Sequence, residues 1–148
     1  MESRTNLEHV AAIRRGGQSA FGELRKIWFI TRSNFSCCQT CATYELAEMA
    51  ARRRRNRACY WHVQDEQHFK RTGVLFMRFC YLPPPGINGN SSVIEAQIGE
   101  QVVVALRNAG LRLEWPGNPN VTIKIVGVAN GSEQPDGKEV ANGPNATL

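Results

Sequence analysis

The sequence lacks the long apolar runs that membrane-spanning helices require. Hydrophobic residues make up 42% of its 148 residues, yet no run approaches the ~18 apolar residues of such a helix. Residues Met1 to Asn6 lead into polar sequence without the apolar segment of a signal peptide. We therefore expect a cytoplasmic protein that makes no membrane contact and keeps its thiols reduced.

A complete disulfide framework is also absent, because the number of cysteines is odd, at five. Charged residues account for only 21%, so the chain as a whole does not have the composition of a disordered protein. Its length fits one domain of ordinary size. We predict a single domain over residues 1–126 and a flexible tail over residues 127–148, which are rich in glycine, asparagine and proline.

Acidic residues are scarce in the first half of the chain. Residues 1–82 contain 14 lysines and arginines against seven acidic residues, whereas residues 83–148 contain four against six. The basic half also holds every cysteine. An anionic partner would therefore meet this half of the protein.

Apolar residues at helical spacing predict three helices in the first third of the chain. The pair Gly16-Gly17 is expected to end the first helix, and Ser36 is expected to cap the third. The third helix begins at the cysteine run and ends in a series of arginines. The predicted helices cover residues 6–15, 19–31 and 37–54.

After Asn56 the pattern becomes strand-like. Two antiparallel strands are predicted over residues 58–63 and 74–81, joined by a polar connection. The later predicted elements are a helix over residues 92–108 and strands over residues 111–115 and 121–126. The order suggests two α-β-β units. We predict an α+β fold with a four-stranded, mostly antiparallel sheet and helices packed on one face.

Three cysteines stand within five positions, in the run Asn34-Phe35-Ser36-Cys37-Cys38-Gln39-Thr40-Cys41. A second polar motif, Tyr60-Trp61-His62-Val63-Gln64-Asp65, follows about twenty residues later. Thiols at this density indicate a metal site, a redox site or a disulfide anchor, and the sequence alone leaves all three open.

The two motifs resemble a bacterial protein family of unknown function. Its members show an N-F-x-C-C-Q-x-C run followed by a Y-x-H-x-Q-D run, and the similarity covers roughly residues 20–126. This chain has Phe69-Lys70-Arg71-Thr72-Gly73 where the family usually has a glycine-rich region. The resemblance directs attention to the three clustered cysteines, His62 and Asp65 but implies no activity.

Zinc binding is the first hypothesis for these residues. Cys38 and Cys41 have the C-x-x-C spacing with which two thiolates reach one tetrahedral ion. His62 could supply a nitrogen ligand, and Cys37 or Cys59 a fourth ligand. A second closely spaced cysteine pair, which structural zinc sites usually have, is not present.

Thiol chemistry is the second hypothesis. Cys38 would lie in the first turn of a helix, where the helix dipole and free N–H groups stabilise a thiolate. Cys38 would then attack and Cys41 would resolve, with His62 as the base and Asp65 orienting it. Alternatively, the cysteines are simply small apolar residues, which is the interpretation we favour for Cys59 and Cys80.

Anion binding is the third hypothesis. Five arginines close the third predicted helix and follow it: Arg52, Arg53, Arg54, Arg55 and Arg57. Such a cluster could contact the phosphates of a nucleic acid or an acidic protein. Tyr60 and Trp61 could stack on bases. A basic helix end also arises from compensation of the helix dipole and from solvation alone, so the cluster does not decide the question.

Overall fold

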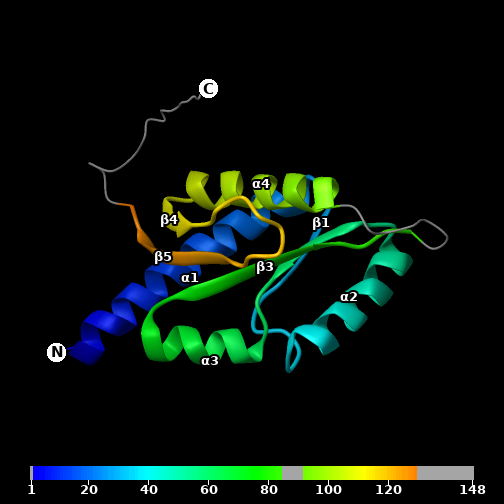
Figure 1. Ribbon diagram of the computed structural model, residues 1–148. Helices are drawn as coiled ribbons and strands as arrows, with labels where there is room; N and C mark the ends of the chain where they lie inside the picture. Colours follow the sequence, from blue (N-terminus) through cyan, green and yellow to red (C-terminus); the bar gives the residue numbers. More distant parts are fainter. Residues whose placement is uncertain (1, 85–91, 130–148) are drawn as a thin grey trace.

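The computed structural model describes residues 2–84 and 92–129, which form four helices and five strands (Figure 1). The helices are α1 (Glu2–Lys26), α2 (Gln39–Arg53), α3 (Val63–Thr72) and α4 (Ser92–Asn108). The strands are β1 (Phe29–Arg32), β2 (Arg57–Tyr60), β3 (Leu75–Tyr81), β4 (Leu111–Glu114) and β5 (Ile123–Val128). Within these ranges, no helix combines the length and the apolarity that crossing a bilayer requires.

The strands form one mixed sheet with the order β1-β2-β3-β5-β4. β1 runs parallel to β2, and the remaining neighbours are antiparallel. The α+β class and the antiparallel pair β2–β3 agree with the sequence-based prediction. The prediction of four strands is wrong by one, because most of the short strand β1 falls within the helix predicted over residues 19–31.

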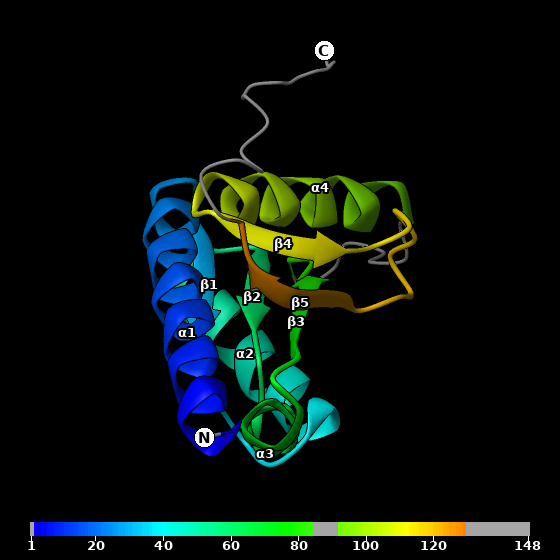
Figure 2. The same ribbon diagram turned by 90° about the vertical axis from the view of Figure 1, so that its left-hand side faces the viewer.

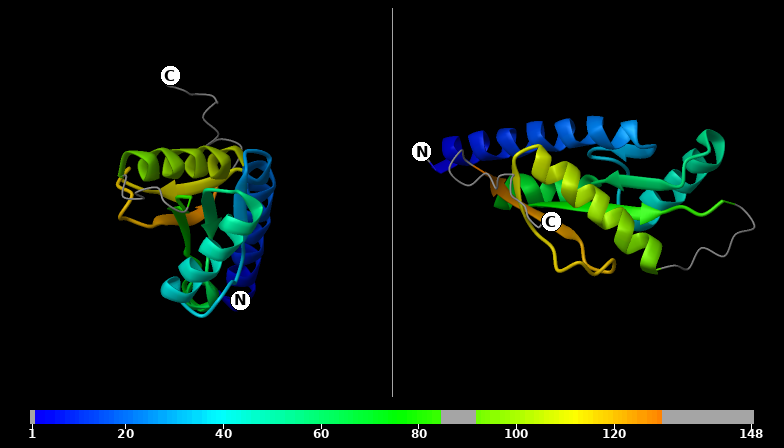
Figure 3. Two further views of the ribbon diagram at one scale, coloured as in Figure 1. Left: turned by 90° about the vertical axis from the view of Figure 1, so that its right-hand side faces the viewer. Right: turned by 90° about the horizontal axis from the view of Figure 1, so that it is seen from above.

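Helices cover both faces of the sheet, not one (Figures 2 and 3). Successive residues of a strand point to opposite faces. Phe29 and Cys59 therefore face the main core under α1 and α4, whereas Ile30 and Ala58 face a smaller core under α2. The α2 side chains in this smaller core repeat every four residues: Ala42, Leu46 and Ala50. The crossover from β1 to the parallel strand β2 places α2 on the second face.

The first helix is continuous through Gly16-Gly17, where we expected a break. Gly16 permits close packing, whereas a Cβ atom on Gly17 would make an ordinary contact. A Cβ atom on Gly16 would lie 2.7 Å from a methyl group of Leu111, and one on Gly17 would lie 3.6 Å from the Trp61 ring. Tertiary contact with the sheet thus compensates for the low helix propensity of the pair.

Two further elements differ from the prediction. Residues 29–32 form β1 because α1 ends at Lys26, and Trp28 turns the chain with a φ of 76°. Residues 63–72 form α3, which we expected to be a polar connection. Both ends of α3 are capped: His62 and Asp65 form a capping box at its start, and Gly73 adopts a left-handed conformation after it.

The predicted boundary between domain and tail falls near the end of the last strand. β5 extends to Val128, and the Ala129 N–H donates to the Gly110 carbonyl at 2.7 Å. Residues 130–148, which make up most of the predicted tail, lie outside the described residues, as do residues 85–91.

The end of α2 provides a test of backbone strain. Arg54 caps this helix with a φ of 56° and a ψ of 45°, a left-handed conformation that glycine adopts more easily. We expect Arg54→Gly to raise the free energy of unfolding in urea by about 0.5–1 kcal/mol. The control Ala51→Gly, inside the same helix, should lower it by about 1 kcal/mol. Equal losses in both variants would contradict the assignment of strain to Arg54.

Candidate functional site

The cysteine run occupies the loop between β1 and α2 and the first turn of α2. Two backbone hydrogen bonds fix this loop against the segment after β2. The Phe35 N–H donates to the Trp61 carbonyl at 3.0 Å, and the Val63 N–H donates to the Ser36 carbonyl at 3.0 Å. Asn34 and Ser36 turn the loop with positive φ values of 50° and 66°. The loop is therefore held in one conformation by the segment that connects β2 to α3.

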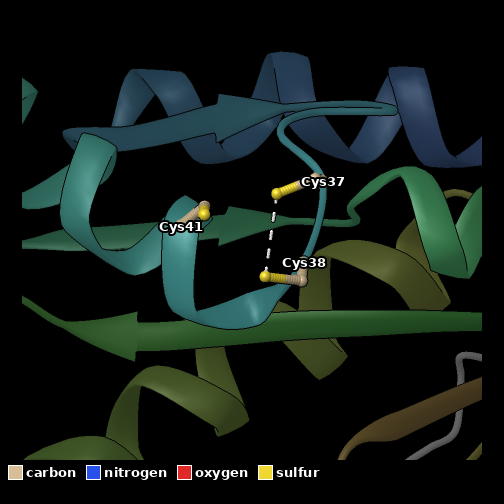
Figure 4. Close-up of side chains that lie close together, drawn as sticks. All are labelled: Cys37, Cys38 and Cys41. Atoms are coloured by element: carbon tan, nitrogen blue, oxygen red, sulfur yellow. Dashed lines mark hydrogen bonds between the residues drawn. The ribbon is translucent and has the colours of Figure 1, made fainter.

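The loop brings three sulfur atoms together at the protein surface (Figure 4). The Sγ atoms of Cys37, Cys38 and Cys41 all lie within 4.8 Å of one another. The Cys37 thiol donates a weak hydrogen bond to Cys38, with the two sulfurs 3.8 Å apart. Cys38 is the N-cap of α2, and Cys41 follows in the first turn. Three thiols in this arrangement could hold a metal ion.

The three thiols are not chemically equivalent. The pKa of Cys38 lies below its ordinary value, chiefly because the Cys41 backbone N–H stabilises the thiolate and secondly because the Cys37 thiol donates to it. The pKa of Cys41 rises to about 11, chiefly because its hydrogen bonds with the Cys37 and Cys38 sulfurs favour the protonated thiol, and secondly because charge on those sulfurs would repel a second thiolate. The cluster thus favours one thiolate, on Cys38, and opposes a second.

His62 lies outside this group of sulfurs. Its side chain is almost fully buried, and its Nδ1 accepts a hydrogen bond from the Asp65 backbone N–H at 3.2 Å. Burial lowers the pKa of His62, against the opposing effect of the Asp65 carboxylate. A neutral ring with Nδ1 occupied has its proton on Nε2. Asp65 Oδ2 accepts from the His62 backbone N–H at 3.2 Å, so the two residues cap α3 reciprocally.

Arg78 on β3 connects the two sequence motifs. Its guanidinium binds both carboxylate oxygens of Asp65, at 2.7 and 2.9 Å. The third nitrogen donates to Oε1 of Gln39, the residue that follows Cys38, at 3.0 Å. The pKa of Arg78 is raised, mainly by its hydrogen bonds to Asp65. Sequence reasoning did not identify Arg78, because an isolated arginine in an apolar strand carries no motif.

A second ion pair fixes the other side of α3. Arg14 of α1 donates to both oxygens of Glu66, at 3.0 and 2.8 Å, and the Trp61 indole donates to Oε1 at 2.8 Å. Burial would raise the pKa of Glu66, but these donors, Arg14 first, hold it below its ordinary value. Trp61 is fully buried, so it does not present a surface on which a base could stack.

The other predicted residues lie away from the sulfur cluster. Cys59 is fully buried, and burial raises its pKa well above the ordinary value. Burial likewise raises the pKa of Cys80 to about 12. The arginines Arg52 to Arg55 lie at the opposite end of α2. Since α2 has 15 residues, this end is about 22 Å from the thiols.

The Arg78 contact can be tested by mutation. Arg78→Gln would leave the buried Asp65 carboxylate without its cation, so we expect the free energy of unfolding to fall by about 3 kcal/mol. Urea denaturation measures the loss. The control Arg71→Gln removes an exposed guanidinium whose partner is the His68 ring, and should change stability by less than about 0.5 kcal/mol. Similar small effects in both variants would refute a structural role for Arg78.

The order of thiol reactivity provides a second test. A lower pKa means a larger thiolate fraction at pH 7, so iodoacetamide should modify Cys38 before Cys41 and Cys80 in protein treated with chelator. Peptide mapping by mass spectrometry gives the rates. In guanidinium the differences should disappear, because the unfolded chain has no helix terminus and no burial. Faster labelling of Cys41 or Cys80 in the native state would contradict the description of the cluster.

Comparison with known proteins agrees with the resemblance noted in the sequence. A family model described as a domain of unknown function (DUF6891) matches residues 18–129. The matched region includes the cysteine loop, α3 with its capping residues, and the five strands described above. No curated protein and no solved structure matches the chain. The chain therefore belongs to the family defined by this domain of unknown function, DUF6891.

Proposed function

We propose that the protein binds a thiophilic metal ion, Zn²⁺, through the sulfurs of Cys37, Cys38 and Cys41. The observation that carries this proposal is the convergence of three Sγ atoms within 4.8 Å on a loop that two backbone hydrogen bonds fix against the segment after β2. Thiolates are soft ligands, and Zn²⁺ is among the metals that such ligands select. The cluster needs no rearrangement of the fold to bind an ion.

The spacing of the sulfurs supports tetrahedral coordination. With Zn–S bonds of about 2.3 Å, the sulfurs of a regular tetrahedron are about 3.8 Å apart. The Cys37–Cys38 separation is 3.8 Å, and the third sulfur lies within 4.8 Å of both. The third sulfur is thus at most about 1 Å farther from each of the others than regular tetrahedral coordination requires.

The charge balance of the cluster also supports a bound cation. Without a cation, deprotonation of Cys41 is opposed by the two neighbouring thiols, so its pKa rises to about 11. A divalent ion reverses this effect, because each thiolate then faces a positive charge. Metal binding would release protons from the thiols, and the affinity for Zn²⁺ would rise with pH across the neutral range.

The fourth coordination position separates two versions of the proposal. His62 was our predicted nitrogen ligand, with Asp65 orienting it. Its Nδ1 already accepts a hydrogen bond and its proton is on Nε2, so His62 could bind the metal only if the ring gave up this capping hydrogen bond. Otherwise a water molecule or an external ligand completes the tetrahedron, as in sites with an open position. His62 as a ligand stays a prediction that the His62→Gln variant tests.

A second function has support from the acidity of Cys38. Its thiolate could attack a disulfide in a partner protein and form a mixed disulfide, releasing the first partner thiolate. Cys41, once deprotonated, would then attack the Cys38 sulfur and release the second partner thiolate. The result is a Cys38–Cys41 disulfide and a reduced partner. A depressed pKa at a helix N-cap and a nearby second thiol favour this chemistry.

Zinc content and the formation of a Cys38–Cys41 disulfide distinguish metal binding from thiol chemistry. We expect protein purified without chelator, or reconstituted with Zn²⁺, to hold one zinc ion per chain by elemental mass spectrometry. Cys41→Ser should weaken binding by more than about tenfold, since it removes one of three sulfur ligands. Cys80→Ala is the matched control, because it removes a thiol outside the cluster and should retain the metal.

The opposite results would favour thiol chemistry over zinc binding. In that case the protein takes up no zinc after reconstitution, and mild oxidation yields a Cys38–Cys41 disulfide in peptide maps. Equal loss of zinc in Cys41→Ser and Cys80→Ala would show that the metal binds elsewhere. Unchanged zinc affinity in His62→Gln would remove His62 from the ligand set and leave the three-sulfur site intact.

A further inference from the structure

A separate concave site lies at the end of α2 opposite the cysteines. A cavity of about 960 Å³ opens where this helix end meets the turn before β1, the start of β2 and the end of β3. Figure 1 shows the C-terminal end of α2 and the end of β3 on the same side of the molecule. The side chains that define its character are Ile27, Trp28, Arg54, Arg55, Arg57 and Leu82. The volume is in the range of small-molecule sites.

Trp28 supplies a flat aromatic wall of this cavity. It is 63% exposed, and its backbone has a φ of 76°, which is an outlier for a bulky residue. The guanidinium of Arg55 lies 4.2 Å from the centroid of the indole ring. An exposed indole in a strained backbone conformation, already stacked against a cation, is a platform for another planar group.

The cavity has positive charge without acidic neighbours. Arg54, Arg55 and Arg57 line it, and none of the described lining residues is acidic. Arg57 donates to the neutral side chains of Asn56 and Gln101, at 3.0 and 2.7 Å. Among the ion pairs of the described residues, none involves any of these three arginines. Their charge is therefore available for an external anion.

The structure also divides the arginine cluster into two parts. Arg52 and Arg53 belong to the last turn of α2 and do not line the cavity. Arg54, in the left-handed cap, and the residues after it turn toward β2 and line the cavity. A polyanion attracted by net charge would engage both parts, whereas a ligand seated in the cavity would engage the second part alone.

We infer that this cavity binds a nucleoside phosphate, with the base stacked on Trp28 and the phosphate held by the lining arginines, Arg54, Arg55 and Arg57. Stacking on an aromatic ring accepts any base, because every base has a π-face. Guanidinium groups match the geometry of phosphate oxygens. The apolar surface of Ile27 and Leu82 suits the remainder of a flat ring system. This inference is independent of metal binding by the cysteines.

Calorimetric titration with AMP tests the inference on the full chain. Wild-type protein should bind AMP in a 1:1 complex, and adenosine, which lacks the phosphate, should bind more weakly. The variant R54Q/R55Q should weaken AMP binding by about tenfold or more. Trp28→Ala should have an effect of similar size through loss of stacking, while Trp28→Phe retains part of the affinity.

The matched control is R52Q/R53Q, which removes the same charge from the same helix end but leaves the cavity lining unchanged. It should alter AMP affinity by less than about threefold, because these side chains contribute only a screened, long-range attraction. Circular dichroism of each variant verifies that it folds.

Three results would overturn the inference. One is the absence of AMP binding to wild-type protein at millimolar concentration. Another is equal weakening by the two double variants, which would indicate a diffuse electrostatic surface. The third is binding of a single-stranded oligonucleotide without any binding of AMP, which would indicate an extended nucleic-acid surface instead of a nucleotide cavity.

Discussion

The bidentate contact between Arg78 and Asp65 is the interaction on which the cysteine loop and α3 both depend. Asp65 is nearly fully buried, so its charge requires a compensating cation. Arg78 supplies it from β3 and also reaches Gln39 at the start of α2. One guanidinium thus joins three elements that are distant in sequence. The glutamine of the cysteine motif and the aspartate of the second motif belong to one hydrogen-bonded network.

The pair Arg14–Glu66 has the same form on the other side of α3. Asp65 and Glu66 are adjacent in the sequence, both are buried, and each binds an arginine through two oxygens. A buried ion pair adds little net stability over an apolar pair, yet loss of one partner is costly. The two pairs therefore define where α3 lies on the sheet, while the apolar core supplies most of the stability.

The sequence predicted those elements whose local pattern agrees with their tertiary role. α2, β3, α4 and the β4–β5 pair have clear periodicity, and the antiparallel strands follow from it. β1 is too short for its pattern to be distinguished from the end of a helix. The Gly16-Gly17 pair predicts a break because of its low helix propensity. The contacts that compensate, with Leu111 and Trp61, come from residues far along the chain and leave no trace in the local pattern.

The candidate sites likewise contain some residues that a local sequence pattern predicts and others that it does not. The sulfur cluster could be predicted, since its three residues lie within five positions at one helix start. Arg78 could not, because its contacts span 13 and 39 positions and follow no local motif. The cavity beside Trp28 combines residues from four segments, and only its arginines carried a sequence signal. Local spacing reveals clusters, but not the long-range partners that complete them.

The anchoring of the cysteine loop to the backbone of Trp61 and Val63 has a consequence for biosynthesis. On the ribosome the chain appears from its N-terminus, so the three thiols are translated at least twenty residues before the segment that fixes their loop. Until then the nascent chain carries a conformationally free Cys-Cys-x-x-Cys sequence. The ordered arrangement of the sulfurs therefore requires the segment after β2, which is translated later than the thiols themselves.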